Sequence, residues 1–202
     1  MEGLGCKLRP KASLMTIVIT PPHDVPDEAS RICRLLTEGK ADIVHIRKPD
    51  WQVDQVESLI ADILAICQHQ GIALQDRLTL HDWHNLAARY SLGGIHLNAR
   101  HPLPPPDWHG RLSRSCHTME ETIRWKQSCD YVSLSPIFDS ISKPGYKSSF
   151  TKGEIEEALG RGIIDRKVMA LGGVTFERLP LVREMGFGGG MILGDAWKMG
   201  GD

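Results

Sequence analysis

Polar and basic side chains follow several short apolar segments of this chain, each at the point where the segment ends. Four histidines occupy such positions: His45, His81, His96 and His117. Arg47 and Lys143 add positive charge at similar places. Imidazole titrates near neutral pH and can transfer protons, while guanidinium and ammonium groups bind phosphate oxygens. If these segment ends meet in the fold, they predict a pocket that binds an anionic ligand and moves protons.

The four histidines leave a metal site open as an alternative, because neutral imidazole is a common ligand of zinc and iron. No segment carries an HxH pair, however, and Asp82 is the one obvious carboxylate among these histidines. The anion-binding pocket is therefore the preferred interpretation.

Eight short apolar segments have the length and composition of β-strands. They are TIVIT (16–20), IVHIR (43–47), RLTLH (77–81), GIHL (94–97), LSRSC (112–116), YVSLS (131–135), KVMAL (167–171) and GGMIL (189–193). Segments with a helical pattern lie between most of them, at 27–39, 50–71, 82–90, 118–127, 151–160 and 175–185. Repeated strand–helix units predict a parallel sheet, and eight units favour a closed (β/α)8 TIM barrel of the α/β class.

Two helices of a complete barrel are absent from this pattern. The proline-rich segment ARHPLPPPDWHG (99–110) replaces the helix after the fourth strand. The sequence has few residues after the eighth strand, so the last helix is predicted to be short or missing. Because Met15 directly precedes the first strand, we interpret residues 1–14 as an N-terminal extension that can be disordered, and 15–202 as a single barrel domain.

Composition argues against several classes of function. A formal net charge of −1 gives no electrostatic attraction to nucleic acid or to an anionic membrane. There is no apolar run near the roughly 20 residues of a membrane helix, and the first residues lack the apolar segment of a signal peptide. The five cysteines are dispersed without CxxC spacing, which suits reduced thiols. We therefore expect a cytoplasmic protein.

Glycines end the last two predicted strands. Gly172 and Gly173 follow the seventh strand, and Gly194 follows the eighth. In TIM barrels the loops after these strands commonly hold phosphate, since glycine lets backbone N–H groups approach the anion. Glycines also end strands for steric reasons, so this prediction depends on the basic residues at the other strand ends.

The order and spacing of the motifs resemble the thiamine phosphate synthase/TenI family of thiamine biosynthesis from about residue 16 to 197. The similar segments are VHIRK (44–48), LHDWHNLA (80–87), GIHLN (94–98), SCHTMEE (115–121), DYVSLSPIFDSISK (130–143) and VMALGGVT (168–175). The resemblance implies an enzyme that joins hydroxymethylpyrimidine diphosphate to thiazole phosphate and releases pyrophosphate. The HIR sequence of the second strand is similar to TenI-like members, so the chain is identified as a divergent, TenI-like member.

The resemblance also implies roles for individual residues. The implied catalytic residues are His117, Arg47, Lys143 and Ser115. The implied substrate- and phosphate-binding residues are His45, Lys48, His81, Ser140, Ser142, Gly172, Gly173, Leu193 and Gly194. In this scheme Arg47 and the Ser140–Lys143 segment bind the diphosphate, and the glycine loops bind the thiazole phosphate.

Magnesium is the cofactor that the resemblance implies, held in the synthases by two aspartates so that it stabilises the leaving group. Asp82 matches the first aspartate. The second is expected after the fourth strand, where Arg100 and His101 stand instead. Losing half of the ligand set predicts weak magnesium binding through Asp82 alone.

Two alternative functions stay open. A TenI-type thiazole tautomerase would use His117 as its acid–base group and would need no diphosphate chemistry. A non-catalytic regulator would bind thiamine phosphate without turnover. The retained Ser-x-Ser-Lys segment, 140–143, favours the synthase. The implied partners are small phosphorylated thiazole and pyrimidine substrates, with neither nucleic acid nor membrane, and a homodimer is compatible with the sequence.

Overall fold

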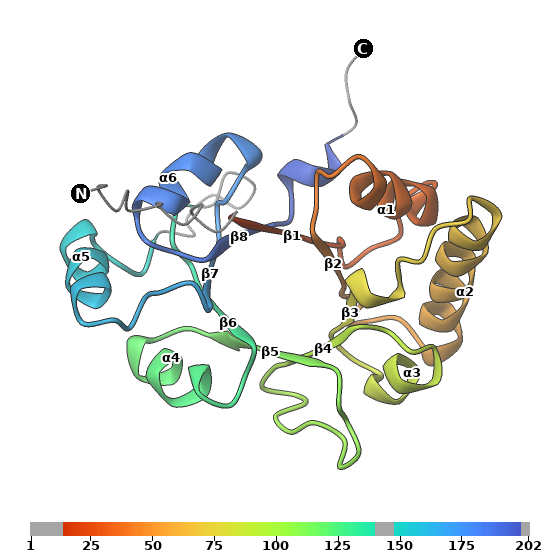
Figure 1. The fold of residues 1–202 in the computed structure, drawn as a ribbon, viewed down its shortest axis with the longest axis horizontal. Coiled ribbons are helices and arrows are strands. Elements are labelled where there is room, and N and C mark those ends of the chain that lie inside the picture. The colour runs from red at the N-terminus through yellow and green to blue at the C-terminus, as the bar shows by residue number, and fades with distance from the viewer. Residues whose placement is uncertain (1–13, 140–147, 199–202) are drawn as a thin grey trace, which may run out of the picture.

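Eight parallel strands close into a barrel in the computed structural model, which describes residues 14–139 and 148–198. Each strand pairs with the next along the chain, and β8 pairs with β1 (Figure 1). The strands are β1 (Met15–Ile19), β2 (Ile43–Ile46), β3 (Leu78–Leu80), β4 (Gly94–Leu97), β5 (Arg111–Cys116), β6 (Tyr131–Leu134), β7 (Val168–Leu171) and β8 (Gly189–Ile192). The predicted (β/α)8 barrel is confirmed, and every strand boundary lies within one residue of its prediction.

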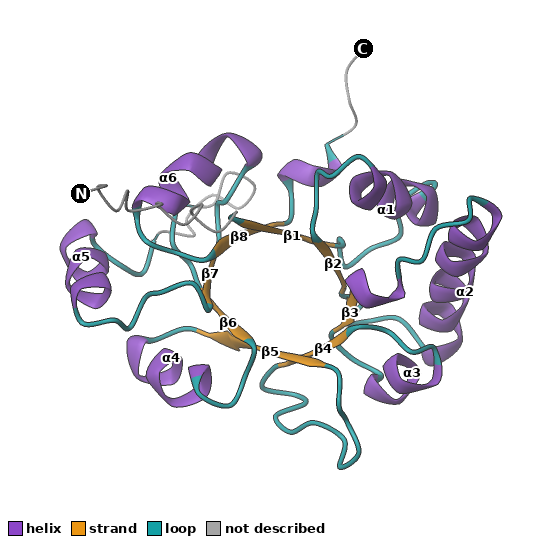
Figure 2. Ribbon diagram, in the orientation of Figure 1, coloured by secondary structure: helices purple, strands orange, loops and turns teal. Residues whose placement is uncertain are grey.

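The helices form a ring outside the barrel (Figure 2). They are α1 (Glu28–Thr37), α2 (Val53–His69), α3 (His84–Arg89), α4 (Met119–Lys126), α5 (Lys152–Gly160) and α6 (Leu179–Glu184), with 3-10 turns at Gln75–Arg77, Phe176–Arg178 and Asp195–Trp197. Side-chain caps begin two of them: the hydroxyl oxygens of Thr118 and Thr151 accept from backbone N–H groups three residues later. The helix predicted at 175–185 is divided into a 3-10 turn and α6.

Both predicted gaps in the helical ring are present in the part of the chain that the structure describes. Residues 98–110 contain no helix, and their loop extends away from the barrel between β4 and β5 (Figure 1). Between β8 and residue 198, where the described residues end, there is one 3-10 turn, whose Trp197 is buried in the main core cluster with α1 and α2 residues. The indole Nε1 donates to the Ile19 carbonyl over 2.7 Å, and Arg31 donates to the Trp197 carbonyl over 3.0 Å. A tryptophan therefore covers the barrel where the last helix would lie.

The interior of the barrel has an apolar side and a polar side. The apolar side is a buried cluster of Ile17, Ile19, Ile43, Tyr131, Met169 and Met191, drawn mainly from β1, β7 and β8. On the polar side, the strand register sets His45 level with Thr79, and His96 level with Ser113. All four of these polar residues are buried. None of the helices in the described residues has the length and apolar character needed to cross a membrane.

Candidate active site

A cavity of about 570 Å³ opens at the carboxyl ends of the strands, where TIM barrels place their active sites. Five of the predicted site residues line it: Arg47, His81, Ser115, His117 and Leu193. They come from the ends of four strands, β2, β3, β5 and β8, so the barrel brings together side chains that are far apart in sequence. The prediction that these strand ends meet at one pocket agrees with this arrangement.

The charges around this cavity are mainly positive. Three arginines line it, Arg47, Arg100 and Arg114, against one carboxylate, Glu121, among the described lining residues. Glu121 accepts a hydrogen bond of 2.6 Å from the backbone N–H of His117, so part of its charge is used at the start of α4. Guanidinium groups bind carboxylate and phosphate oxygens, often through two parallel hydrogen bonds. The cavity therefore suits an anionic ligand.

A hydrogen-bonded histidine cluster forms the floor of the cavity. The Nδ1 of His45 lies 2.9 Å from the Nε2 of His81, and the Nε2 of His45 lies 2.6 Å from the hydroxyl of Tyr131. The ring of His81 stacks on that of His96, with 4.2 Å between their centroids. His96 in turn lies 2.8 Å from the hydroxyls of both Ser113 and Ser115. Ser115 thereby links the floor to the open cavity.

Burial determines the protonation of this cluster. Loss of hydration lowers the pKa of His45 and His81 well below the usual range, with neighbouring positive groups adding to the effect. The same cause, followed by charges on His84, Arg114 and Arg47, lowers the pKa of His96 to about 3. All three imidazoles are therefore neutral at pH 7, so they serve as hydrogen-bond donors and acceptors and add no positive charge.

Three of the four histidines considered as metal ligands lie together. One nitrogen from each of His45, His81 and His96 falls within 4.8 Å of the others, which is close enough for a shared metal ion. His117 does not belong to this group. Hydrogen bonds already engage both ring nitrogens of His45 and of His96. The arrangement is therefore that of a satisfied polar network, which explains how three imidazoles can be buried together.

His117 lies at the edge of the cavity, directly before α4. Its Nδ1 is 3.2 Å from the Ser135 hydroxyl and 3.3 Å from the Ser135 carbonyl. The residue as a whole is exposed, unlike the three histidines of the floor. A partly oriented, solvent-accessible imidazole at a strand end has the properties needed for proton transfer.

Asp82 lies at the end of β3 with two basic side chains beside it. Its Oδ1 is 3.3 Å from both Arg100 Nη2 and His101 Nε2, and its Oδ2 accepts from Arg100 Nη2 over 3.4 Å. Magnesium takes oxygen ligands, commonly one or two carboxylates with water and phosphate oxygens. Here the group next to the carboxylate is a guanidinium, so these residues fit a magnesium ion poorly. Magnesium at Asp82 stays a prediction.

Lys48 is held away from the cavity. Its ammonium donates to Glu28 Oε2 over 2.7 Å and to the His23 carbonyl over 2.8 Å, and it lies 4.4 Å from the centre of the Trp51 ring. The side chain has no exposed surface. The phosphate-binding role predicted for Lys48 receives no support from this position, which is that of a structural ion pair.

The glycine loops after β7 and β8 are present as predicted. Gly172 and Gly173 have φ angles of +93° and +61°. A Cβ on Gly172 would lie 2.8 Å from Pro136, and one on Gly173 only 2.4 Å from the Asp139 carbonyl oxygen. Both positions therefore require glycine. Gly194 precedes the last 3-10 turn, and Leu193 reaches the cavity.

A carboxylate of the protein, that of Asp195, already binds one backbone N–H group close to the glycine loop after β7. Asp195 Oδ2 accepts a 3.1 Å hydrogen bond from the backbone N–H of Phe176, and Asp195 Oδ1 pairs with Lys198 at 2.7 Å. The Lys198 hydrogen bond, followed by the Phe176 N–H, lowers the pKa of Asp195, so the carboxylate is charged at neutral pH. A bound phosphate would use the amides of the glycine loop itself, not that of Phe176.

Three predicted residues, Ser140, Ser142 and Lys143, lie outside the described residues. Two contributors were missed by sequence reasoning: Arg114 on the cavity wall and Tyr131 beneath it. Arg114 lies under the Trp125 ring at 3.9 Å and donates to the Pro102 carbonyl over 2.8 Å. A charge inside a strand segment is a signal that could have identified it, because such a charge is costly unless it has partners.

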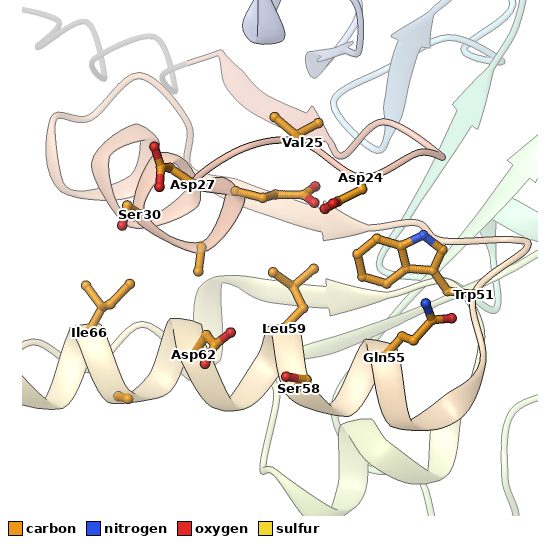
Figure 3. Close-up of a pocket in the computed structure, with 13 residues that line it drawn as sticks. Asp24, Val25, Asp27, Ser30, Trp51, Gln55, Ser58, Leu59, Asp62 and Ile66 are labelled. Carbon is orange, nitrogen blue, oxygen red and sulfur yellow. The ribbon is translucent and has the colours of Figure 1, made fainter.

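A larger recess of about 710 Å³ lies outside the barrel between α1 and α2 (Figure 3). Trp51 and Gln55 stand at one end and Ile66 at the other, with Asp24, Asp27 and Asp62 around it. None of the predicted site residues lines it. The smaller cavity, at the strand ends, is therefore the candidate active site.

Comparison with known proteins is consistent with this geometry. Residues 16–193 match the family model described as thiamine monophosphate synthase. A thiamine-phosphate synthase of Thermus thermophilus is 28% identical, over 84% of this chain and 82% of the relative. One from Photorhabdus laumondii is 31% identical, over 82% of this chain and 77% of the relative.

A solved structure gives the same result. The crystal structure of a thiamine phosphate pyrophosphorylase from Bacteroides thetaiotaomicron superposes with a TM-score of 0.78 at 37% identity, covering 93% of this chain and 87% of that one. The match of the family model across nearly all eight strands, with relatives above 30% identity, confirms the resemblance read from the motifs. This chain belongs to the thiamine monophosphate synthase family.

Proposed function

We propose that this protein is a transferase of thiamine biosynthesis that joins hydroxymethylpyrimidine diphosphate to thiazole phosphate and releases pyrophosphate. The observation that carries the proposal is the cavity at the strand ends, where Arg47, Arg100 and Arg114 face a space without a matching number of carboxylates. Such a site favours a substrate with several negative charges. The relatives named thiamine-phosphate synthase support the same reaction.

The reaction breaks the bond between the pyrimidine methylene carbon and the diphosphate oxygen, and pyrophosphate leaves with the electron pair. The thiazole nitrogen then forms a bond to that carbon. Arg47, at the end of β2, stabilises the charge that develops on the leaving oxygens. Ser115 donates or accepts a hydrogen bond at the floor, where His96 fixes its hydroxyl.

The apolar wall of the cavity has a separate part in this proposal. Ile19, Leu171 and Met191 line the side opposite the histidines. They provide a surface against which the aromatic rings of the two substrates can pack without water. The glycine loop after β7 then receives the thiazole phosphate, since its backbone amides can approach an anion closely.

A thiazole tautomerase is the second candidate, and one observation favours it. His117 is exposed at the cavity edge with its Nδ1 near the Ser135 hydroxyl, so the ring is free to exchange protons with a bound ligand. Moving a proton between two positions of a thiazole requires a single acid–base group and an anion site. This reaction needs none of the charge stabilisation that a diphosphate demands.

Product analysis of the purified full-length protein separates the two. With both synthase substrates, we expect release of pyrophosphate together with thiamine phosphate. If the protein is a synthase and His117 only borders the site, the His117→Ala variant should keep most of the pyrophosphate-releasing activity in the same assay. If the tautomerase is correct instead, the wild type converts the thiazole tautomer without releasing pyrophosphate, and His117→Ala lowers that rate by about 100-fold. Arg89→Ala, on the exposed side of α3, is the control.

A further inference from the structure

The loop after β4 holds a guanidinium against the carboxylate of Asp82. The side-chain carbonyl of Asn98 accepts from the backbone N–H groups of Arg100 and His101, over 2.9 and 3.0 Å. The Asn98 amide donates to the His81 carbonyl over 3.4 Å, which ties this turn to the end of β3. The turn is thus fastened next to Asp82 by its own side chain.

Asp82 and Arg100 differ sharply in exposure. The Asp82 side chain is 9% exposed, whereas that of Arg100 is 52% exposed and lines the cavity. One end of the guanidinium, Nη2, therefore faces a buried carboxylate, and Nη1 donates to the Pro49 carbonyl over 3.4 Å. Because guanidinium has five N–H donors, the contacts with Asp82 and Pro49 leave donors for a ligand in the cavity.

The same place suits a divalent cation badly. A magnesium ion bound to Asp82 would share the carboxylate with Arg100 Nη2, which lies 3.3 Å from Oδ1 and 3.4 Å from Oδ2. Two positive centres on one carboxylate repel each other in a partly buried site. The protein supplies a permanent positive charge where the family resemblance implies a metal ion.

We propose that Arg100 replaces the metal ion in this protein, binding the diphosphate of the substrate directly so that binding requires no magnesium. Asp82 is then a positioning residue, which orients the guanidinium towards the cavity. The inference rests on the proposed function for the identity of the diphosphate, but metal-independent binding of a diphosphate can be measured without any turnover.

Binding of inorganic pyrophosphate to the full-length protein, measured by calorimetry in EDTA, tests the proposal. We expect saturable binding in EDTA, with a dissociation constant that changes less than about threefold when magnesium replaces the chelator. Arg100→Gln should weaken binding about tenfold or more, the loss expected for a charge-assisted contact. Arg89→Gln is the control: it removes another exposed arginine, on α3, and should leave binding unchanged.

A charge reversal gives the sharper test. Arg100→Asp places a second carboxylate near Asp82, so pyrophosphate binding should be lost in EDTA and recovered in part by magnesium. Asp82→Asn keeps the shape of the side chain but removes the charge that orients Arg100. It should weaken binding less than Arg100→Gln does, as expected for a positioning residue.

Two results would overturn the inference: pyrophosphate that binds the wild type only with magnesium, or binding that Arg100→Gln leaves unchanged. Failure of the proposed function has a different signature. In that case pyrophosphate binds in EDTA and depends on Arg100, while the two synthase substrates give no thiamine phosphate.

Discussion

The two sides of the barrel interior differ in where their polar groups come from. On the polar side, β2 to β5 bury histidine and serine side chains that bond to one another, as in the pairs His45–His81 and His96–Ser115. On the side of β7 and β8, the interior holds Met169 and Met191, and polar groups come from backbone at the glycine loops. The first half therefore presents polar side chains, and the second presents backbone at positions without a side chain.

The two halves should therefore be sensitive to different kinds of substitution. The polar half should respond to changes of charge and of pH, because its groups are ionisable and several are fully buried. The glycine half should respond to any added Cβ, whatever its chemistry, because Gly172 and Gly173 pack against residues 136–139, which follow β6. Substitutions of each kind therefore test whether the two halves differ in this way.

The largest effect is expected from removing a charge on the polar half. Arg47→Ala should lower kcat/KM of the proposed synthase reaction about 100- to 1000-fold, the cost typical of losing one group that stabilises a developing negative charge. The fold should be unaffected, because the described residues contain no ion pair to this guanidinium. Steady-state kinetics and a thermal melt test the two statements.

Arg89→Ala is the matched control for that experiment. Arg89 pairs with Glu57 outside the barrel and is 65% exposed, so its loss should change neither kcat/KM nor the melting temperature measurably. Equal activity of wild type and Arg47→Ala would show that the charge at the end of β2 has no part in the reaction.

Acidification should produce the next largest effect, on stability. Burial lowers the pKa values of His45, His81 and His96 in the folded protein, while in the unfolded chain they return to about 6.5. Below pH 6.5 the unfolded state binds more protons, so the stabilisation is present above that pH and is lost as the pH falls. We expect about 1 kcal/mol per histidine, or about 3 kcal/mol together, between pH 6.5 and 5.5. Urea denaturation at several pH values measures this slope.

Substituting one histidine of the cavity floor isolates its contribution to the pH dependence of stability. His45→Gln removes one buried titrating group, so it should reduce the pH slope by about a third even though it is less stable at every pH. His69→Gln, at an exposed position in the last turn of α2, should leave the slope unchanged. A slope that His45→Gln does not alter would mean that other groups control the acid response.

Most of the fold followed from local patterns in the sequence. Short β-rich segments fixed the strands to within a residue, and the lack of a helical pattern at 99–110 identified the missing helix. Because parallel strands of a barrel end on one face, the segment ends also located the cavity, with Arg47, Ser115 and His117 along it.

Sequence order could not separate residues that line the cavity from those beside it. The two residues directly after β2 diverge: Arg47 reaches the cavity, whereas Lys48 turns away to pair with Glu28. That partner lies 20 residues away in the chain, and the pairing depends on how α1 packs. The contact of Arg100 with Asp82 could likewise not be predicted from the sequence, because it depends on the turn that the Asn98 side chain stabilises. Long-range ion pairs of this kind leave no local signal.

The glycine half should give the smallest of the three effects, through stability. Gly173→Ala adds a Cβ at a φ of +61°, 2.4 Å from the Asp139 carbonyl oxygen, so the loop after β6 must move. We expect a loss of about 2 kcal/mol in the free energy of unfolding, within the range for a strained non-glycine residue.

Gly160→Ala is the matched control, because a Cβ there meets nothing within 4 Å at the end of α5. It should be neutral or stabilising by up to about 1 kcal/mol, since alanine favours a helix. Urea denaturation compares the pair, and equal stability of the two variants would show that the loop after β7 tolerates a side chain and that the contrast between the two halves is not one of packing.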